Sequence, residues 1–254
     1  MAMNEPILLN AFPKAGTHYL AQLIQPLAAP NRATTGGIAG HTHQGWGRDR
    51  RPAESVLLDL SQVQAGERTI AHLPADPRYA KFMYERGWGM IFLYRDLRDV
   101  AVSQASHLPS LRAHPFGERL IGLPFEERLA EIITGFADAP GGDWYPSLQR
   151  RWAEYAGWRE WGWILPIRFE QAIEDRRGTC EAICDYLRRR TGRHWDNTVI
   201  RAMERAHKPR QSPTFRDGRS GAWREQLTGA ARAAARRELG PALVDLGYEQ
   251  SLDW

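Results

Sequence analysis

The most constraining feature of this sequence is a unit that recurs along it, a short apolar run followed by a segment typical of a helix. Three such runs read PILLNAF at 6–12, MIFLYRD at 90–96 and WILPIRF at 163–169. Short apolar runs that alternate with helical segments are typical of parallel strands buried on both faces. We therefore predict an α/β fold, a single domain over residues 1–254 with a central parallel β-sheet flanked by helices.

Length and composition agree with this fold class. A chain of 254 residues with 43% hydrophobic residues suits one large domain with a sizeable core. No apolar run approaches the roughly 18 residues of a membrane-spanning helix. Residues 1–6 lack the basic stretch before an apolar helix that marks a signal peptide. We expect no membrane partner and a cytoplasmic location.

Charge and cysteine content limit the kinds of ligand. A net charge of +4 is too small to indicate a nucleic-acid-binding protein, but it suits an anionic ligand. Cys180 and Cys184 stand four residues apart in a predicted helix, with no further ligands nearby to complete a zinc site. We expect both to face the core, and we expect no metal and no disulfide framework.

The first candidate site is the segment 12–19 (FPKAGTHY), which follows the first predicted strand and leads into a predicted helix. Parallel sheets bind ligands at the carboxyl ends of their strands, and a helix that begins there offers unpaired N–H groups to an anion. Gly16 allows the backbone to approach a ligand closely, and Thr17 can cap the helix. Lys14 can reach a phosphate or sulfate oxygen.

The order of residues in this segment argues against a triphosphate loop. The P-loop of nucleotide hydrolases reads G-x-x-x-x-G-K-[ST], with its lysine after the second glycine. Here Lys14 precedes Gly16, the only glycine of the segment. The arrangement suits a donor with one phosphate and a terminal sulfuryl group.

A second block lies at 94–103 (YRDLRDVAVS). In this block and in the segment 12–19, the sequence resembles the cytosolic-type sulfotransferases that use 3'-phosphoadenosine 5'-phosphosulfate (PAPS). Their first loop reads P-K-S-G-T-T-W, and the resemblance implies donor contacts from Lys14, Ala15, Gly16, Thr17, His18 and Tyr19. It further implies the P-loop-like sulfotransferase fold, with Arg95 and Ser103 gripping the 3'-phosphate. The alternative reading of the second block is a solvated helix start with favourable charge pairing.

Two further blocks resemble the nucleotide-binding parts of the family. The segment 208–224 contains FRDGRSGAWR at 215–224, which is similar to the loop R-K-G-x-x-G-D-W-[KR] that closes over the 3'-phosphate and adenine. The resemblance implies donor contacts from Phe215, Arg216, Asp217 and Gly218, with Arg216 the main one because Asp217 replaces a lysine. Phe169, in a strand end similar to F-Y-E-D, would stack near the adenine without a hydroxyl.

The candidate catalytic base is His72. The segment 70–74 (IAHLP) is similar to the family's K-T-H-L-P, in which the histidine removes the acceptor's proton, although Ile70 stands where the family has lysine. A histidine has a pKa near neutrality, which suits it to accept a proton from an attacking hydroxyl. Lys14 and His72 are therefore the expected catalytic residues.

The implied function is transfer of a sulfuryl group from PAPS to a hydroxyl or amine of a small-molecule acceptor, with 3'-phosphoadenosine 5'-phosphate (PAP) as product. Segments 30–54 and 108–143 are expected to shape the acceptor pocket, and a metal site at His41 and His43 stays open. Two other classes also stay open. One is a kinase with a variant phosphate loop, and the other is a non-catalytic protein that binds the nucleotide.

Overall fold

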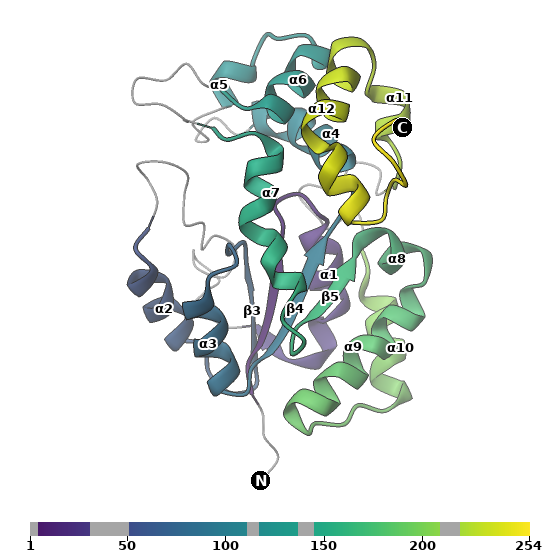
Figure 1. The fold of residues 1–254 in the computed structure, drawn as a ribbon. Helices are drawn as coiled ribbons and strands as arrows, with labels where there is room; N and C mark the ends of the chain where they lie inside the picture. The colour runs from purple at the N-terminus through teal and green to yellow at the C-terminus, as the bar shows by residue number, and fades with distance from the viewer. Residues whose placement is uncertain (1–4, 31–50, 111–116, 137–144, 209–218) are drawn as a thin grey trace. The chain divides into compact units, whose positions relative to one another are not determined.

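The computed structural model describes residues 5–30, 51–110, 117–136, 145–208 and 219–254 (Figure 1). The chain divides into two compact units. The first, called the sheet unit, comprises residues 1–94 and 154–215, and the second, called the helical unit, comprises residues 95–153 and 216–254.

The described residues of the sheet unit form a parallel sheet of five strands in the order β2-β3-β1-β4-β5. The strands are β1 (Ile7–Ala11), β2 (Ala29–Pro30), β3 (Glu67–Ala71), β4 (Gly89–Tyr94) and β5 (Leu165–Arg168). Every residue of β1 is buried, as are all residues of β4 except Tyr94. The central strands are thus covered on both faces, which confirms the predicted parallel α/β fold.

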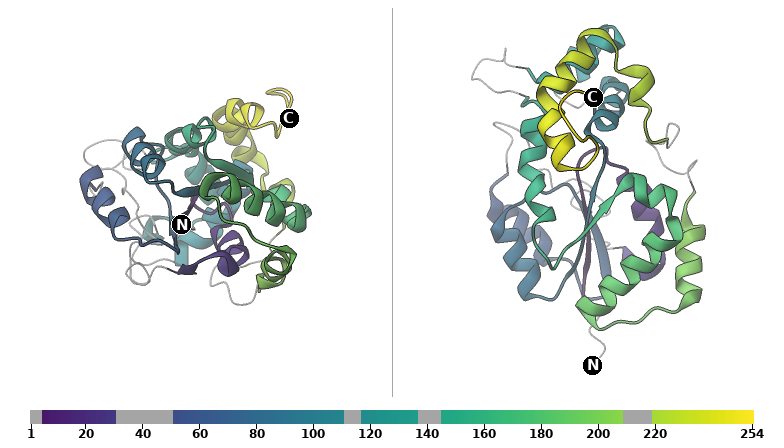
Figure 2. Two further views of the ribbon diagram at one scale, coloured as in Figure 1. Left: turned by 90° about the horizontal axis from the view of Figure 1, so that it is seen from below. Right: turned by 45° about the vertical axis from the view of Figure 1, so that its right-hand side comes forward.

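Helices cover both faces of this sheet. They are α1 (Thr17–Leu23), η1 (Gln25–Leu27), α2 (Ala53–Ser61), α3 (Pro77–Glu85), η4 (Gly157–Arg159), α8 (Phe169–Glu174), α9 (Arg176–Thr191) and α10 (Asn197–Ala206). Figure 2 shows α1, α9 and α10 against one face and α2 and α3 against the other, as right-handed crossovers between parallel strands require. The side chain of Tyr186 in α9 accepts a hydrogen bond of 2.7 Å from the backbone N–H of Met90 in β4.

Local sequence signals explain several element boundaries. The carboxylate of Asp76 accepts a hydrogen bond from the backbone N–H of Arg78 at 2.8 Å and so caps α3, with Pro77 in its first turn. Pro166 lies in β5, an outermost strand of the sheet, where its missing N–H costs no central ladder bond. Cys180 and Cys184 are buried in α9, as predicted.

The helical unit is built from helices that pack on one another. Its helices are α4 (Leu97–His107), η3 (Leu108–Ser110), α5 (Gly117–Leu120), α6 (Phe125–Thr134), α11 (Trp223–Gln226) and α12 (Gly229–Asp245), while α7 (Leu148–Ala156) crosses the division between the units. Helix α12 packs against α6 and α4 through small and apolar side chains that include Ala231, Ala235 and Leu239. No helix in the described residues combines the length and the hydropathy needed to cross a membrane.

Candidate active site

The chain makes a tight turn between β1 and α1. The N–H of Ala15 donates to the carbonyl oxygen of Phe12 at 3.0 Å, and Pro13 and Lys14 occupy the two central positions. Lys14 has a φ of 70°, and no other non-glycine residue among the described ones has a positive φ. These are the marks of a type II turn, whose third position normally takes glycine. A lysine there costs about 1–2 kcal/mol, and such local strain is typical of functional sites.

Gly16 follows as the N-cap residue of α1, with a φ of 104° and no side-chain cap. A Cβ atom at this position would lie 2.4 Å from two ring carbons of Phe169. Both the left-handed backbone and the ring of Phe169 therefore require glycine. Beside it Ala15 is buried, Thr17 is half-buried and His18 is exposed.

Tyr19 lies in a cluster of rings beside this turn. Its ring centroid is 5.8 Å from that of Phe169 and 4.7 Å from that of His207, in edge-to-face geometry. Its hydroxyl donates to the carbonyl oxygen of Ala172 at 2.6 Å, and Arg176 Nε donates to the same hydroxyl at 3.3 Å. The two predicted residues Tyr19 and Phe169 are thus brought together next to Gly16.

His207 belongs to the same cluster and was not predicted. Arg176 Nη2 lies 3.3 Å from His207 Nδ1, and because a guanidinium can only donate, this nitrogen is the acceptor. Burial, and then the charge of Arg176, lower the pKa of His207, while burial raises the pKa of Tyr19. No local pattern marks His207, because it lies in an aperiodic segment and meets its partners only through the fold.

His72 follows β3 directly, beside the end of β1. Its Nδ1 lies 2.6 Å from the carbonyl oxygen of Ala11. A carbonyl oxygen can only accept, so Nδ1 carries the proton, and in the neutral ring Nε2 holds the lone pair. This tautomer is the one in which Nε2 can accept a proton.

The backbone that carries His72 is fastened by buried side chains. Asn10 donates from Nδ2 to the carbonyl oxygen of Leu73 at 2.9 Å and accepts from its N–H at 2.7 Å. Trp158 Nε1 donates to the same carbonyl oxygen at 2.7 Å, and the Tyr155 hydroxyl donates to the carbonyl oxygen of His72 at 3.0 Å. Asn10 thus continues the pairing of β1 with β3 past the last ladder residue.

The second block opens the helical unit, where Arg95 directly follows β4 in the chain. The side chain of Asp96 caps α4 by accepting from the N–H of Arg98 at 2.9 Å. Asp96, Arg98 and Asp99 are only 4%, 1% and 1% exposed. The alternative reading of these charges as a solvated helix start is therefore wrong, since buried charges need defined partners.

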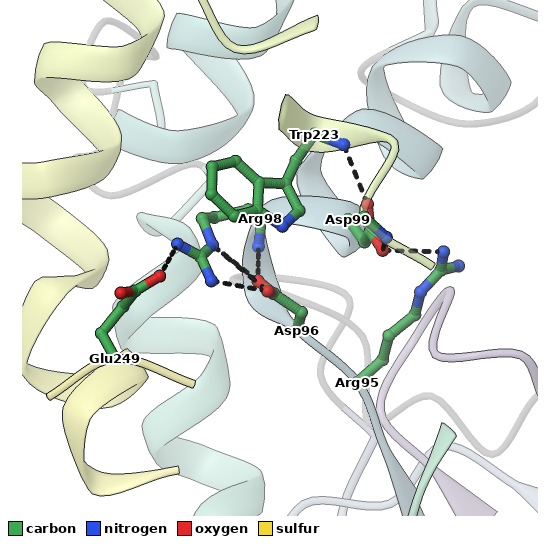
Figure 3. A network of polar contacts seen from close by, with 7 residues as sticks. Arg95, Asp96, Arg98, Asp99, Trp223 and Glu249 are labelled. Atoms are coloured by element: carbon green, nitrogen blue, oxygen red, sulfur yellow. Dashed lines mark hydrogen bonds and ion pairs between the residues drawn. The ribbon is translucent and has the colours of Figure 1, made fainter. Parts of the chain in front are cut away.

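Asp99 and Arg95 bind the described part of the third block (Figure 3). Asp99 Oδ2 accepts from Arg95 Nη2 at 3.1 Å and from the N–H of Gly221 at 2.8 Å. Asp99 Oδ1 accepts from the N–H of Trp223 at 3.1 Å, and Arg95 Nη2 also donates to the carbonyl oxygen of Arg219 at 2.8 Å. Asp99, whose side chain is fully buried, is thus a structural centre that sequence reasoning missed.

Of the remaining residues predicted to form the site, some lie within the residues that the structure describes and others lie outside them. Ser103 is half-buried in α4, two turns after Arg95. Outside the described residues lie Phe215, Arg216, Asp217, Gly218, His41 and His43. Within the described ranges no three His, Cys, Asp or Glu side chains gather closely enough to hold a metal ion.

A parallel sheet with a strained lysine turn after its first strand and a histidine after the neighbouring strand has the layout of an α/β protein that binds its ligand at the carboxyl ends of the strands. The family model for the sulfotransferase domain matches residues 4–246. The chain belongs to this family.

Two curated relatives are similar to this chain. Sulfotransferase 2A1 of Rattus norvegicus is 26% identical over 190 residues, which are 72% of this chain and 60% of the relative. Sulfotransferase 2A2 of Mus musculus is 28% identical over 196 residues, which are 74% of this chain and 61% of the relative. The chain thus matches about three fifths of the length of these relatives.

Two solved structures share the fold. Mouse sulfotransferase SULT7A1 complexed with PAP has a TM-score of 0.62 at 17% identity, covering 96% of this chain and 86% of that one. Retinol dehydratase in complex with androsterone and the inactive cofactor PAP has a TM-score of 0.60 at 16% identity, covering 94% of this chain and 81% of that one. At these identities the similarity establishes the sulfotransferase fold.

Proposed function

We propose that this protein transfers the sulfuryl group of PAPS to a hydroxyl or amine of a small-molecule acceptor and releases PAP. The observation that carries the proposal is the fixed tautomer of His72 at the end of β3, beside the strand that leads into the Lys14 turn. Family membership supports the reaction class. The solved neighbours support the nucleotide and the acceptor class, since one is described with PAP and another with androsterone and PAP.

The turn after β1 is proposed to bind the 5' end of the donor, which supplies the sulfuryl group. A phosphosulfate is anionic, so a fixed cation and outward-facing N–H groups are the chemistry that it needs. Lys14 provides the cation from a turn whose backbone is set by Pro13 and by the bond from Ala15 to Phe12. The N–H of Ala15 is used within the turn, so the backbone N–H groups of Gly16, Thr17 and His18 and the hydroxyl of Thr17 are proposed to contact the donor.

His72 is proposed as the general base. The acceptor's proton moves to Nε2 as its oxygen or nitrogen forms the new bond to sulfur, and the bond between sulfur and the bridging oxygen of PAPS breaks to release PAP. The bond from Nδ1 to the carbonyl oxygen of Ala11 holds the ring in place and stabilises the positive charge that the ring gains. The Lys14 side chain stabilises the negative charge that develops on the leaving oxygen of PAP.

The remaining donor contacts are proposed from the other motifs. Arg95 and Ser103 would hold the 3'-phosphate, because a guanidinium and a hydroxyl are strong donors to a phosphate monoester. The ring cluster of Tyr19 and Phe169 would border the adenine. Phe215, Arg216, Asp217 and Gly218 are proposed, on the motif alone, to complete the nucleotide contacts.

The test combines an acceptor screen with two separated measurements. Purified protein, PAPS and a panel of alcohols, phenols and amines are incubated, and mass spectrometry detects the added sulfuryl group. For the best acceptor, His72→Ala should lower kcat by a factor of about 10²–10⁴, while PAP affinity measured by calorimetry stays within about twofold. His194→Ala is the matched control, because His194 is an exposed histidine of the same unit.

Other outcomes point to other classes. ATP binding that is tighter than PAP binding, with phosphoryl transfer, would indicate a kinase. PAP binding without transfer to any acceptor would indicate a non-catalytic nucleotide-binding protein. Full PAPS turnover by Lys14→Ala would refute the role of the first turn.

A further inference from the structure

Arg98 is the centre of a second network that lies within the helical unit (Figure 3). Its Nε and Nη2 donate to Asp96 Oδ1 and Oδ2 at 3.0 Å and 2.8 Å, and its Nη1 donates to Glu249 Oε1. The side chain of Arg98 is only 2% exposed. One buried guanidinium thus bridges the start of α4 to a carboxylate that stands 151 residues away in the sequence.

Two tryptophan rings flank the same guanidinium. Arg98 Cζ lies 3.6 Å from the ring centroid of Trp223 and 4.4 Å from that of Trp254. The two indole rings are 5.6 Å apart and meet edge to face at 83°. Arginine is suited to this place because its planar cation stacks on aromatic faces while its edge donates to carboxylates.

Two segments meet at Arg98. The first, called the clasp segment, is 247–254, which supplies Glu249 and Trp254 and lies beyond the family match that ends at residue 246. The second, called the anchored loop, is 219–223, which supplies Trp223. The network therefore joins residues outside the family match to a loop within it.

The anchored loop leads back to Arg95. The Trp223 ring stacks on Arg98, while the backbone N–H of Trp223 donates to Asp99 Oδ1. The other oxygen of Asp99 binds both the Gly221 N–H and Arg95 Nη2. A displacement of Trp223 therefore pulls on the carboxylate that orients Arg95.

We infer that the clasp segment acts through Arg98 and Trp223 to hold the anchored loop and Arg95 in the arrangement that binds the 3'-phosphate of the donor. Glu249 and Trp254 are then positioning residues, since they act through other side chains and need not touch the nucleotide. The inference rests on the proposed function. Loss of these contacts should therefore weaken binding of the 3'-phosphate and leave binding of the rest of the nucleotide unchanged.

The experiment compares two nucleotides that differ by this phosphate. Calorimetry on the full chain gives the Kd for PAP and for adenosine 5'-phosphate, which lacks the 3'-phosphate. Glu249→Ala and Trp254→Ala should each weaken PAP binding by about tenfold, while the weaker binding of adenosine 5'-phosphate changes by less than about twofold. Asp253→Ala is the matched control, because its exposed side chain lies in the clasp segment outside the network.

A conservative variant separates positioning from folding. Trp254→Phe keeps a ring for Arg98 and should restore most of the PAP affinity that Trp254→Ala loses. Thermal unfolding of each variant identifies any that no longer folds. Glu249 variants keep the pair of Arg98 with Asp96, so they test the clasp without leaving a buried charge unpaired.

The failures are distinguishable. If the wild-type protein prefers PAP but Glu249→Ala and Trp254→Ala keep that preference, or lose affinity for both nucleotides equally, the role of the clasp segment is refuted. If the wild-type protein shows no preference for PAP over adenosine 5'-phosphate, the proposed function itself fails, and the inference fails with it.

Discussion

Replacing Gly16 by alanine adds one methyl group where the turn after β1 passes against the ring of Phe169. The backbone φ of 104° disfavours any side chain, which costs about 1–2 kcal/mol. The new Cβ would stand 2.4 Å from two ring carbons, and overpacking of this kind costs about 1–3 kcal/mol more. We expect Gly16→Ala to lower the free energy of unfolding by about 2–5 kcal/mol, out of a total of about 5–15.

The assay is urea unfolding of a double-mutant cycle with Phe169→Ala. Phe169 is 4% exposed, so its truncation alone should cost about 3–5 kcal/mol. The double variant removes the clash but keeps the strained φ, so its cost should fall short of the sum by about 1–3 kcal/mol. Gly192→Ala, with a φ of 71° and no atom within 4 Å of the added Cβ, controls for strain alone at about 1–2 kcal/mol.

Additivity within about 0.5 kcal/mol would refute this reasoning, because it would mean that the ring of Phe169 does not press on the loop. PAP affinity of the same variants gives a second readout. Gly16→Ala should weaken it, while Gly192→Ala should leave it unchanged.

Three further predictions concern Lys14, His207 and the cysteines. Lys14→Gly relieves the left-handed backbone and should be more stable than Lys14→Ala by about 1 kcal/mol, although both should lose at least about a hundredfold in kcat. The pKa of His207 lies below its ordinary 6.5, so the unfolded chain binds the proton more tightly. Acidification below pH 6.5 should therefore destabilise the wild-type protein more than His207→Gln, as measured by Tm between pH 5 and 7.5. Burial raises the pKa of Cys180 to about 12 and that of Cys184 to about 11, so a thiol reagent at pH 8 should label them only after unfolding.

Each of these has a result that contradicts it. Equal stability of the two Lys14 variants would mean that the turn is unstrained. The same pH dependence of Tm in the wild-type protein and in His207→Gln would show that His207 does not cause the destabilisation by acid. Rapid labelling of the native protein at pH 8 would show that α9 opens readily or that the thiols are accessible.

Much of the fold could be predicted because the central strands β1 and β4 are buried on both faces. Such strands appear in a sequence as continuous apolar runs, and the run at 90–96 indicated β4 to within two residues. Pro166 suits its place in the edge strand β5, since a proline removes a ladder donor. The segment 55–60 (SVLLDL) is also a short apolar run, yet it lies within α2, because so short a run does not distinguish a buried strand from a helix.

The sequence indicates the geometry of the candidate site only where the interacting residues are close in the chain. Lys14 and Gly16 lie in one turn, so the sequence of that segment alone indicates a turn that leads into a helix. Asp99 was not recognised, because alternating charges at a helix start look solvated, and its partners Gly221 and Trp223 stand 122 and 124 residues away. Burial of a charged group depends on such distant contacts, which local patterns do not contain.

The fastened backbone around His72 makes the two nitrogens of its ring chemically separable. Asn10, Tyr155 and Trp158 hold the flanking peptide groups, so a change in the ring alone should leave the main chain in place. Semisynthesis could therefore install a histidine methylated on one nitrogen. A methyl on Nε2 would block proton acceptance and keep the bond to Ala11, whereas a methyl on Nδ1 would break that bond and leave Nε2 basic. Because the carbonyl oxygen of Ala11 binds Nδ1, methylation of Nε2 tests the proton acceptor and methylation of Nδ1 tests the hydrogen bond that orients the ring.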